Sequence, residues 1–370
     1  MPHLGGVERY AQCLAKALVN SGNRVIVVTS KYENEPTKDI IEGVEILRTD
    51  SFFLMGDRLP IYKYDSSNSK IVEYLKNQSI DRIIINTKLY TLSYMAVRFA
   101  GKYRIPTIII EHGTGHIEFS NRFVTKIGEI YEHVLTRLIK SHCRNFVGVS
   151  GDCCIWLNHF GIKALGVLYN SIDPEEIENI LDDNRSIRDQ QTIVYSGRVI
   201  REKGVNNLIS AFVKIENDFP GSKLIIIGDG NELDNLIKTY GDDTRIEFKG
   251  RKPYYEAIRE LGSGGIFCMP TYYPEGLPTC VLEAMSAGLY IITTQAGGLK
   301  ELVIDGSYGS ILPYGSEDEV IKELRRVLSM DPEQFGRIAR NGKERVNSIF
   351  TWNNTVKELE CIMREIDNGH

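Results

Sequence analysis

Residues 270–288 read PTYYPEGLPTCVLEAMSAG, and two glutamates in this stretch, Glu275 and Glu283, have seven residues between them. Gly276 and Pro278 predict that a loop turns into a helix here, because glycine tolerates unusual backbone angles and proline suits a first helical position. The stretch therefore predicts Glu275 on a loop and Glu283 inside the helix that follows.

An apolar run, residues 266–269, comes just before this loop and predicts a short strand. A loop that leads from the end of a strand into a helix is where α/β proteins bind ligands. The N–H groups at a helix start favour an anion, and carboxylates bind hydroxyl groups. A site that binds a phosphate beside hydroxyl groups suits a sugar nucleotide as its ligand. The alternative is a buried helix whose acidic residues only interact favourably with the helix dipole.

The composition is that of a globular protein with two domains. The chain has 370 residues, more than one hydrophobic core usually supports, and it is 42% hydrophobic and 25% charged. The sequence shows no apolar run near the roughly 20 residues that a membrane-spanning helix needs, and no signal peptide. The seven cysteines lack the paired spacing of a zinc site, so we expect a cytoplasmic protein.

Charge is divided unevenly along the chain. Residues 1–170 hold 21 basic and 16 acidic side chains, a net charge of +5, whereas the whole chain has a net charge of −5. Neither half is basic enough to predict a nucleic-acid partner. Residues 121–144 predict an amphipathic basic helix that docks on an anionic membrane surface, the alternative being that its apolar face packs on a sheet. The predicted basic patch consists of Arg122, Lys126, Arg137 and Lys140.

Strand-like apolar runs alternate with helical patterns along the chain. The predicted strands are residues 24–30, 44–47, 82–86, 105–110, 146–150, 192–196, 223–227, 246–250, 266–269 and 289–294. Glycine-rich turns from strand to helix fall in both halves. This order predicts an α/β chain of two doubly wound domains that face each other across a cleft.

A pair of basic residues stands at another turn from strand to helix. Arg198 directly follows the predicted strand 192–196 and Gly197, and Lys203 precedes a helical pattern that begins at Val205. Two cations and a helix start at one point suit a diphosphate leaving group, because fixed donors stabilise the charge that develops on it. The alternative is two solvated surface cations.

Four stretches resemble retaining glycosyltransferases of family 4, also called glycosyl transferases group 1. EGLPTCVLE (275–283) resembles the family's E-x(7)-E motif, and GRVIREKG (197–204) resembles its GR...EKG motif. GDG (228–230) resembles the G-x-G turn near the nucleotide, and LYNSID (168–173) resembles the hinge between the domains, with serine in place of the family's glycine. The resemblance extends over nearly the whole chain.

The resemblance implies a GT-B fold, with residues 1–173 as the acceptor-side domain, residues 174–351 as the donor domain and residues 352–370 as a helix that closes the first. It implies a retaining hexosyltransferase that needs no cofactor and uses a nucleotide-diphosphate sugar of the UDP or GDP type. We expect a lipid-linked or oligosaccharide acceptor, a role in cell-surface polysaccharide synthesis, and a location on the inner face of the membrane.

The resemblance also implies a role for each site residue. Arg198 and Lys203 hold the diphosphate, and Glu283 binds the ribose. Glu275 and His112 bind the donor sugar from the two domains, although a lone histidine is more often structural. No metal site is predicted, because no D-x-D sequence stands at a strand end and the basic pair can replace a metal's charge. The remaining donor-binding residues are Gly5, Gly6, Gly197, Gly228, Gly230, Arg251, Gly276, Leu277, Pro278 and Thr279.

One departure concerns residues 1–9, which resemble the family's glycine-rich loop or, alternatively, form a simple turn before a helix. In the family a strand precedes this loop, whereas here Met1 stands at the loop itself. We therefore expect the native protein to begin upstream of Met1 with a short apolar strand. Two rival functions stay open: a sugar-nucleotide epimerase of the same fold, and an inactive partner subunit of another glycosyltransferase.

Overall fold

The chain forms two compact units. The computed structural model describes residues 5–32, 35–54, 59–116, 122–181 and 189–368. The first unit comprises Met1–Asn170 and Trp352–His370, and the second comprises Ser171–Thr351. Each unit is described by itself below.

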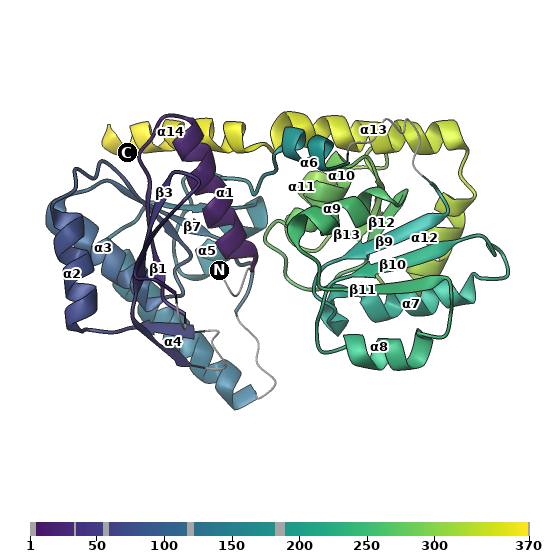
Figure 1. Ribbon diagram of the computed structural model, residues 1–370, viewed down its shortest axis with the longest axis horizontal. Helices are drawn as coiled ribbons and strands as arrows, with labels where there is room; N and C mark the ends of the chain where they lie inside the picture. Colours follow the sequence, from purple (N-terminus) through teal and green to yellow (C-terminus); the bar gives the residue numbers. More distant parts are fainter. Residues whose placement is uncertain (1–4, 33–34, 55–58, 117–121, 182–188, 369–370) are drawn as a thin grey trace. The chain divides into compact units, whose positions relative to one another are not determined.

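The second unit is built on one parallel sheet of six strands, in the order β11-β10-β9-β12-β13-β14 (Figure 1). The chain starts in the middle, at β9, runs outward to β11, and then crosses to β12 on the other side of β9. A doubly wound sheet binds its ligand at this reversal of strand order. The strands are β9 (Thr192–Ser196), β10 (Lys223–Ile227), β11 (Ile246–Gly250), β12 (Ile266–Met269), β13 (Tyr290–Thr294) and β14 (Ser310–Leu312).

Helices cover both faces of this sheet, which explains why its central strands are apolar along their whole length. All residues of β12 and β13 are buried. On one face α7 packs against α12, and on the other face α10 packs against α13 (Figure 1). The helices are α6 (Pro174–Leu181), the short 3₁₀ helix η1 (Arg201–Lys203), α7 (Val205–Lys214), α8 (Leu233–Tyr240), α9 (Tyr254–Gly262), α10 (Thr279–Ser286), α11 (Leu299–Leu302), α12 (Glu317–Leu328) and α13 (Pro332–Ile349).

The first unit contains two separate three-stranded sheets, with orders β1-β3-β2 and β6-β7-β8, and a β4-β5 pair. All pairings are parallel except β2 with β3 and β4 with β5. The strands are β1 (Ile26–Ser30), β2 (Lys38–Ile41), β3 (Val44–Thr49), β4 (Ser51–Leu54), β5 (Leu59–Tyr62), β6 (Ile83–Asn86), β7 (Thr107–Glu111) and β8 (Phe146–Gly148).

Strands β1 and β6 each stand at an edge of their three-stranded sheet. Within the described residues, β1 pairs only with β3 and β6 pairs only with β7. Four of the five residues of β1 are only half-buried, whereas all of β7 is buried. The upstream strand expected from the sequence stays a prediction, and residues 1–4 of the predicted glycine-rich loop lie outside the described residues.

Six helices of the first unit surround these sheets in the part that the structure describes. The last of them packs on the first: the rings of Trp352 in α14 and Tyr10 in α1 lie 5.2 Å apart, and the Thr355 hydroxyl donates to the Tyr169 carbonyl at 3.2 Å. The helices are α1 (Gly6–Asn20), α2 (Ser66–Lys76), α3 (Thr91–Tyr103), α4 (Arg122–Lys140), α5 (Gly151–His159) and α14 (Trp352–Asp367).

Helix α4 corresponds to the amphipathic helix predicted for residues 121–144, of which residue 121 lies outside the described residues. Its Leu135 and Ile139 join the core beside Ile109 of β7. The opposite side, which we call the α4 stripe, is exposed, so the alternative in which this apolar face packs on a sheet is wrong. The stripe consists of Phe123, Ile127, Ile130, Val134 and Leu138, which are 73%, 48%, 57%, 55% and 42% exposed. No helix among the described residues is long and apolar enough to span a membrane.

Candidate functional site

The loops that follow β9 and β12 meet at the strand-order reversal of the second unit. Lys203 ends η1 in the first of these loops, and Glu275 lies in the second. Their side chains form an ion pair, and each residue is only 7% exposed. Two residues that the sequence places 72 positions apart are thus brought together, and each neutralises a charge that is costly to bury alone.

Tyr273, for which no role was predicted from the sequence, lies beside both Arg198 and Lys203. The guanidinium of Arg198 lies 5.2 Å from the ring centre of Tyr273, and the Lys203 ammonium lies 5.4 Å from it. Arg198 is exposed, whereas Lys203 is buried. Both cations are thus attracted to one aromatic ring. The sequence offered one indication of Tyr273, namely its position in the loop two residues before Glu275, the first residue of the E-x(7)-E motif.

The carbonyl of Glu202 ties the two loops together. It accepts hydrogen bonds from the backbone N–H groups of Tyr272 and Tyr273 at 3.0 and 3.1 Å, and from the Thr271 hydroxyl at 3.2 Å. The Thr271 hydroxyl also lies 3.4 Å from Oε1 of Glu275. Because Glu202 directly precedes Lys203, this anchor fixes the spacing between the lysine and the glutamate.

Two glycines of the predicted donor site allow neighbouring loops to touch backbone to backbone. A Cβ atom on Gly228 would lie 1.8 Å from the Gly197 carbonyl oxygen, and a Cβ on Gly230 would lie 2.3 Å from that of Val199. The Val199 N–H donates to the Asp229 carbonyl at 2.9 Å. These glycines therefore hold the loop after β10 against the loop that carries Arg198.

Behind Glu275 a similar contact involves Gly297, which has φ +57°, a backbone conformation that favours glycine. A Cβ there would lie 1.7 Å from the Glu275 carbonyl oxygen. The next residue, Gly298, donates its N–H to the Gly276 carbonyl at 3.0 Å. These glycines support the loop that carries the glutamate.

The predicted helix after this loop is α10, which begins at Thr279, one residue later than the sequence indicated, with Pro278 as its N-terminal cap. Leu277 before it is buried. Cys280 in the first turn reports on the surroundings: burial raises the pKa of its thiol to about 12, and the charges of Lys203, Glu275 and Glu283 all act on it. The charge of Glu283 thus acts on the same thiol as the charges of the ion pair.

The other assigned residues are more distant in the sheet or belong to the first unit. Arg251 is exposed and follows β11, which β10 separates from β9. Gly5 caps α1 and donates its N–H to the Glu8 carboxylate at 3.0 Å, and Gly6 begins the helix.

His112 directly follows β7 in the first unit, as the sequence predicted. Its Nε2 lies 3.0 Å from the Asn86 side-chain oxygen, which can only accept, so Nε2 carries the proton. The ring of Tyr10 contacts it edge to face at 4.7 Å. Burial lowers the pKa of His112 to about 4, so the imidazole is neutral at physiological pH.

Solved structures share this architecture. A sucrose-phosphate synthase from Thermosynechococcus elongatus superimposes with a TM-score of 0.77 at 18% identity, covering 99% of this chain and 94% of that one. Anabaena HepE in complex with UDP-glucose gives a TM-score of 0.71 at 17% identity, covering 99% and 97%. Both likenesses indicate the GT-B fold.

Sequence relatives and family models cover the chain from end to end. An uncharacterised glycosyltransferase of Methanocaldococcus jannaschii is 24% identical over 100% of this chain and 97% of its own length. The alpha-monoglucosyldiacylglycerol synthase of Acholeplasma laidlawii is 25% identical over 93% and 89%. The model for Glycosyltransferase Family 4 matches residues 4–176, and that for Glycosyl transferases group 1 matches residues 176–345. The chain therefore belongs to the family 4, or group 1, glycosyltransferases.

Proposed function

We propose that this glycosyltransferase transfers a hexose from a nucleotide-diphosphate sugar, with retention of configuration, to a lipid-linked or saccharide acceptor in cell-surface polysaccharide synthesis. The observation that carries the proposal is the approach of Arg198 and Lys203 to one ring, that of Tyr273, beside Glu275. Preorganised cations stabilise the charge that develops on a diphosphate when its bond to the sugar breaks. The leaving phosphate takes the acceptor proton, and no metal is required.

The ion pair gives Lys203 two alternative partners. Without donor, Glu275 neutralises the buried ammonium. A diphosphate oxygen can take over this role, because it is also an anion that accepts charge-assisted hydrogen bonds. Glu275 is then released to accept hydrogen bonds from sugar hydroxyls, as its proposed role requires. Donor binding thus gives Lys203 a new anionic partner and gives the Glu275 carboxylate hydroxyl donors in place of the ammonium.

In this proposal the residues around the ion pair bind the ribose and the sugar of the donor. Glu283 binds the ribose hydroxyls, the backbone from Gly276 to Thr279 faces the sugar, and the start of α10 favours an anion. Because HepE was solved with UDP-glucose, we favour a UDP sugar over a GDP sugar. His112 contributes from the first unit as a neutral hydrogen-bonding group.

The α4 stripe supports a membrane-associated acceptor on the cytoplasmic side. Arg122, Lys126 and Arg137 lie along one edge of the stripe by helical spacing, and Lys126 also pairs with Glu129 at 2.6 Å. Lys140 contributes less than expected, because its ammonium donates to the carbonyls of Phe160 and Gly161. An apolar stripe with a basic edge suits an anionic lipid surface. The synthase of Acholeplasma laidlawii, by its name, makes a glycolipid.

The assay that tests this function measures free nucleotide diphosphate and the anomeric configuration of the product. The protein is incubated with UDP- and GDP-sugars, with and without lipid-linked or saccharide acceptors. We expect acceptor-dependent release of nucleotide diphosphate and a retained anomeric configuration, and unchanged activity after treatment with a chelator. An inverted product, or conversion of the nucleotide sugar to its epimer without acceptor, would contradict the proposal.

Two single-residue variants test whether the transfer depends on the basic pair of the second unit. Arg198→Ala and Lys203→Ala should each lower turnover by about two to three decades, the effect of removing a preorganised charge stabiliser. Lys214→Ala is the matched control, since this exposed lysine of the same unit pairs with Glu317 away from the loops. Near-normal turnover in either loop variant would exclude the diphosphate role.

A further inference from the structure

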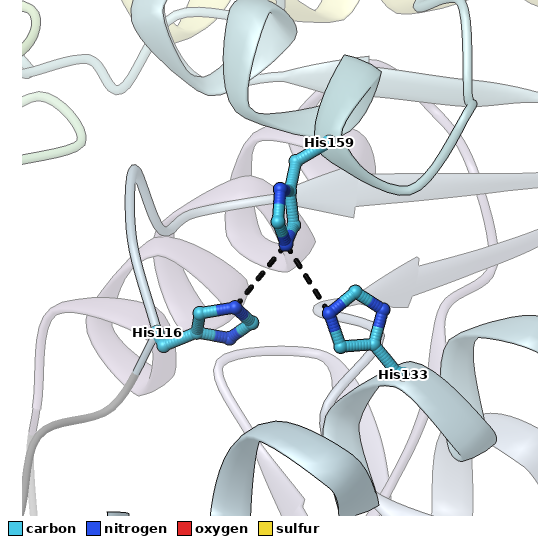
Figure 2. Close-up of side chains that lie close together, drawn as sticks. All are labelled: His116, His133 and His159. Carbon is cyan, nitrogen blue, oxygen red and sulfur yellow. Dashed lines mark hydrogen bonds between the residues drawn. The ribbon is translucent and has the colours of Figure 1, made fainter. Parts of the chain in front are cut away.

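Three histidine side chains of the first unit meet at one point (Figure 2). His116 lies in the loop after β7, His133 in α4, and His159 at the end of α5. One ring nitrogen from each histidine lies within 4.8 Å of those from the other two. The proposed sugar transfer assigns no task to any of them.

The distances between these nitrogens suit a metal ion. Nε2 of His159 lies 3.3 Å from Nε2 of His116 and 3.2 Å from Nε2 of His133. Zinc binds imidazole nitrogens at about 2.0–2.1 Å in a tetrahedron, which places two of them about 3.3 Å apart. The two separations from Nε2 of His159 are close to that value, and the third pair of nitrogens lies within 4.8 Å.

Hydrogen bonds among the rings do not account for both contacts of His159. An imidazole nitrogen offers either one proton or one lone pair, so Nε2 of His159 makes one well-directed hydrogen bond at a time. Both of its neighbours are also Nε2 atoms, of His116 and His133. A cation between the three rings accepts one lone pair from each and satisfies all three nitrogens.

Glu132 holds the ring of His116 in the orientation that a metal ligand needs. One oxygen of this buried carboxylate lies 2.7 Å from Nδ1 of His116, and the other accepts from the buried Lys88 ammonium at 2.6 Å. The Glu132 carboxylate oxygen beside the ring accepts a hydrogen bond, so Nδ1 donates its proton to Glu132. The lone pair on Nε2 then points into the cluster, as in the carboxylate–histidine–zinc arrangement.

Aromatic neighbours restrict the other two rings. Trp156 stacks on His159 with ring centres 4.8 Å apart and an angle of 6° between the planes. The ring of Phe160 lies 4.9 Å from that of His133. His133 and His159 are nevertheless exposed, so a cation can reach the cluster from solvent.

We propose that His116, His133 and His159 bind one zinc ion, whose fourth position is taken by water. Three imidazoles around a tetrahedral ion are a ligand set that zinc accepts. The metal would join the loop after β7 to α4 and α5, and so stabilise the first unit. The proposal departs from the sequence prediction of no metal site, and it leaves the metal-free diphosphate chemistry of the second unit unchanged.

The test measures zinc bound to the full chain without an affinity tag. The protein is stripped with a chelator, dialysed against Zn²⁺ and analysed by mass spectrometry for bound metal. We expect one tight zinc per chain, a tetrahedral visible spectrum with Co²⁺, and a loss of affinity of at least about 100-fold in His133→Ala and His159→Ala. His142→Ala is the matched control, because this exposed histidine follows α4 but lies outside the cluster.

Thermal unfolding supplies a second readout. Zinc should raise the melting temperature of the wild type and of His142→Ala, because it binds the folded state, and should leave His133→Ala unchanged. Both cluster variants replace exposed side chains, so their circular dichroism should match the wild type. Tight zinc binding that survives in both cluster variants, or an octahedral cobalt spectrum, would overturn the proposal, as would no binding by the wild type.

Discussion

Lys203 and Glu275 bind each other where the loops after β9 and β12 meet, and both side chains are buried. Burial makes this pair responsive to a ligand, since the Lys203 ammonium cannot lose Glu275 without another anion taking its place, and the Glu275 carboxylate then needs other hydrogen-bond donors. A surface ion pair would not have this property, because water solvates both members.

Replacing Glu275 by Gln should therefore destabilise the protein in a way that UDP reverses. The change leaves the buried Lys203 ammonium without its anion, and we expect a loss of about 3 kcal/mol in the free energy of unfolding. Bound UDP supplies phosphate oxygens to Lys203, so UDP should raise the melting temperature more in Glu275→Gln than in the wild type. Thermal unfolding with and without UDP measures both effects.

The control for this variant is Glu317→Gln, which removes the partner of the exposed Lys214. This change should lower the free energy of unfolding by less than about 1 kcal/mol, and UDP should raise the melting temperature as much as it does in the wild type. If UDP stabilises Glu275→Gln no more than the wild type, diphosphate and glutamate do not compete for Lys203, and the proposed exchange is wrong.

The glycine of the loop after β10 offers a test of the backbone contact. In Gly228→Ala, the new Cβ would lie 1.8 Å from the Gly197 carbonyl oxygen, and φ is +138° at this position. One of the two loops must move, so we expect a loss of about 3 kcal/mol or more in stability and weaker UDP binding. Gly221→Ala is the control, because a Cβ there meets nothing within 4 Å. Equal denaturant midpoints for the two variants would show that the loops are not packed as described.

The sequence predicted the second unit better than the first. Four of its strands, β9, β10, β11 and β12, have the bounds that the apolar runs indicated. β9, β10 and β12 lie inside the sheet with helices on both faces, so apolar residues make up most of each strand, whereas β11 stands at the sheet edge and includes Glu247 and Lys249. Glu275 and Lys203 were assigned by their motifs, but only the sheet order, which places β12 beside β9, brings them into contact.

The first unit contains strands and a side-chain cluster that no sequence pattern predicted. No strand was predicted between residues 47 and 82, yet this segment includes the antiparallel pair of β4 and β5. β2 was missed because three of its four residues are exposed, so it has no apolar run. The histidine cluster was missed for another reason: His116, His133 and His159 come from three elements without any regular spacing, and only folding makes them neighbours.

The neutral state of His112 predicts a pH dependence of stability. Its pKa is about 4 in the folded protein and about 6.5 when unfolded, so between these values the unfolded chain binds more protons. Stability is unaffected by this group above about pH 6.5 and falls as the pH drops toward 4. We expect the wild type to lose about 3 kcal/mol through His112 over this window.

The comparison of the wild type with His112→Gln isolates this effect. Glutamine does not titrate and can still donate to Asn86, so the difference in urea midpoint should shift in favour of the variant as the pH falls. His142→Gln, which replaces an exposed histidine, should follow the wild type. A constant difference between His112→Gln and the wild type from pH 7 to about 4 would show that His112 protonates in the folded state as easily as in water.

The α4 stripe predicts binding to anionic vesicles through its apolar side chains. Ile127 and Ile130 are 48% and 57% exposed, so the double variant Ile127→Ser/Ile130→Ser should fold with nearly unchanged stability. Each isoleucine would bury part of its surface in the lipid interface. At about 25 cal/mol per Å² of apolar surface, losing both should weaken vesicle binding at least about tenfold. Sedimentation with anionic and neutral liposomes at low salt measures the partition.

Ile237→Ser is the matched control, because this isoleucine is 43% exposed on α8 of the second unit. It should bind anionic vesicles like the wild type. Because the basic edge of the stripe contributes through charge, binding should also weaken as salt is added, whereas the apolar contribution persists. Equal sedimentation with anionic and neutral vesicles would show that the charges of Arg122, Lys126 and Arg137 do not contribute to membrane binding. Unchanged binding by the double variant would instead show that a surface other than α4 meets the membrane.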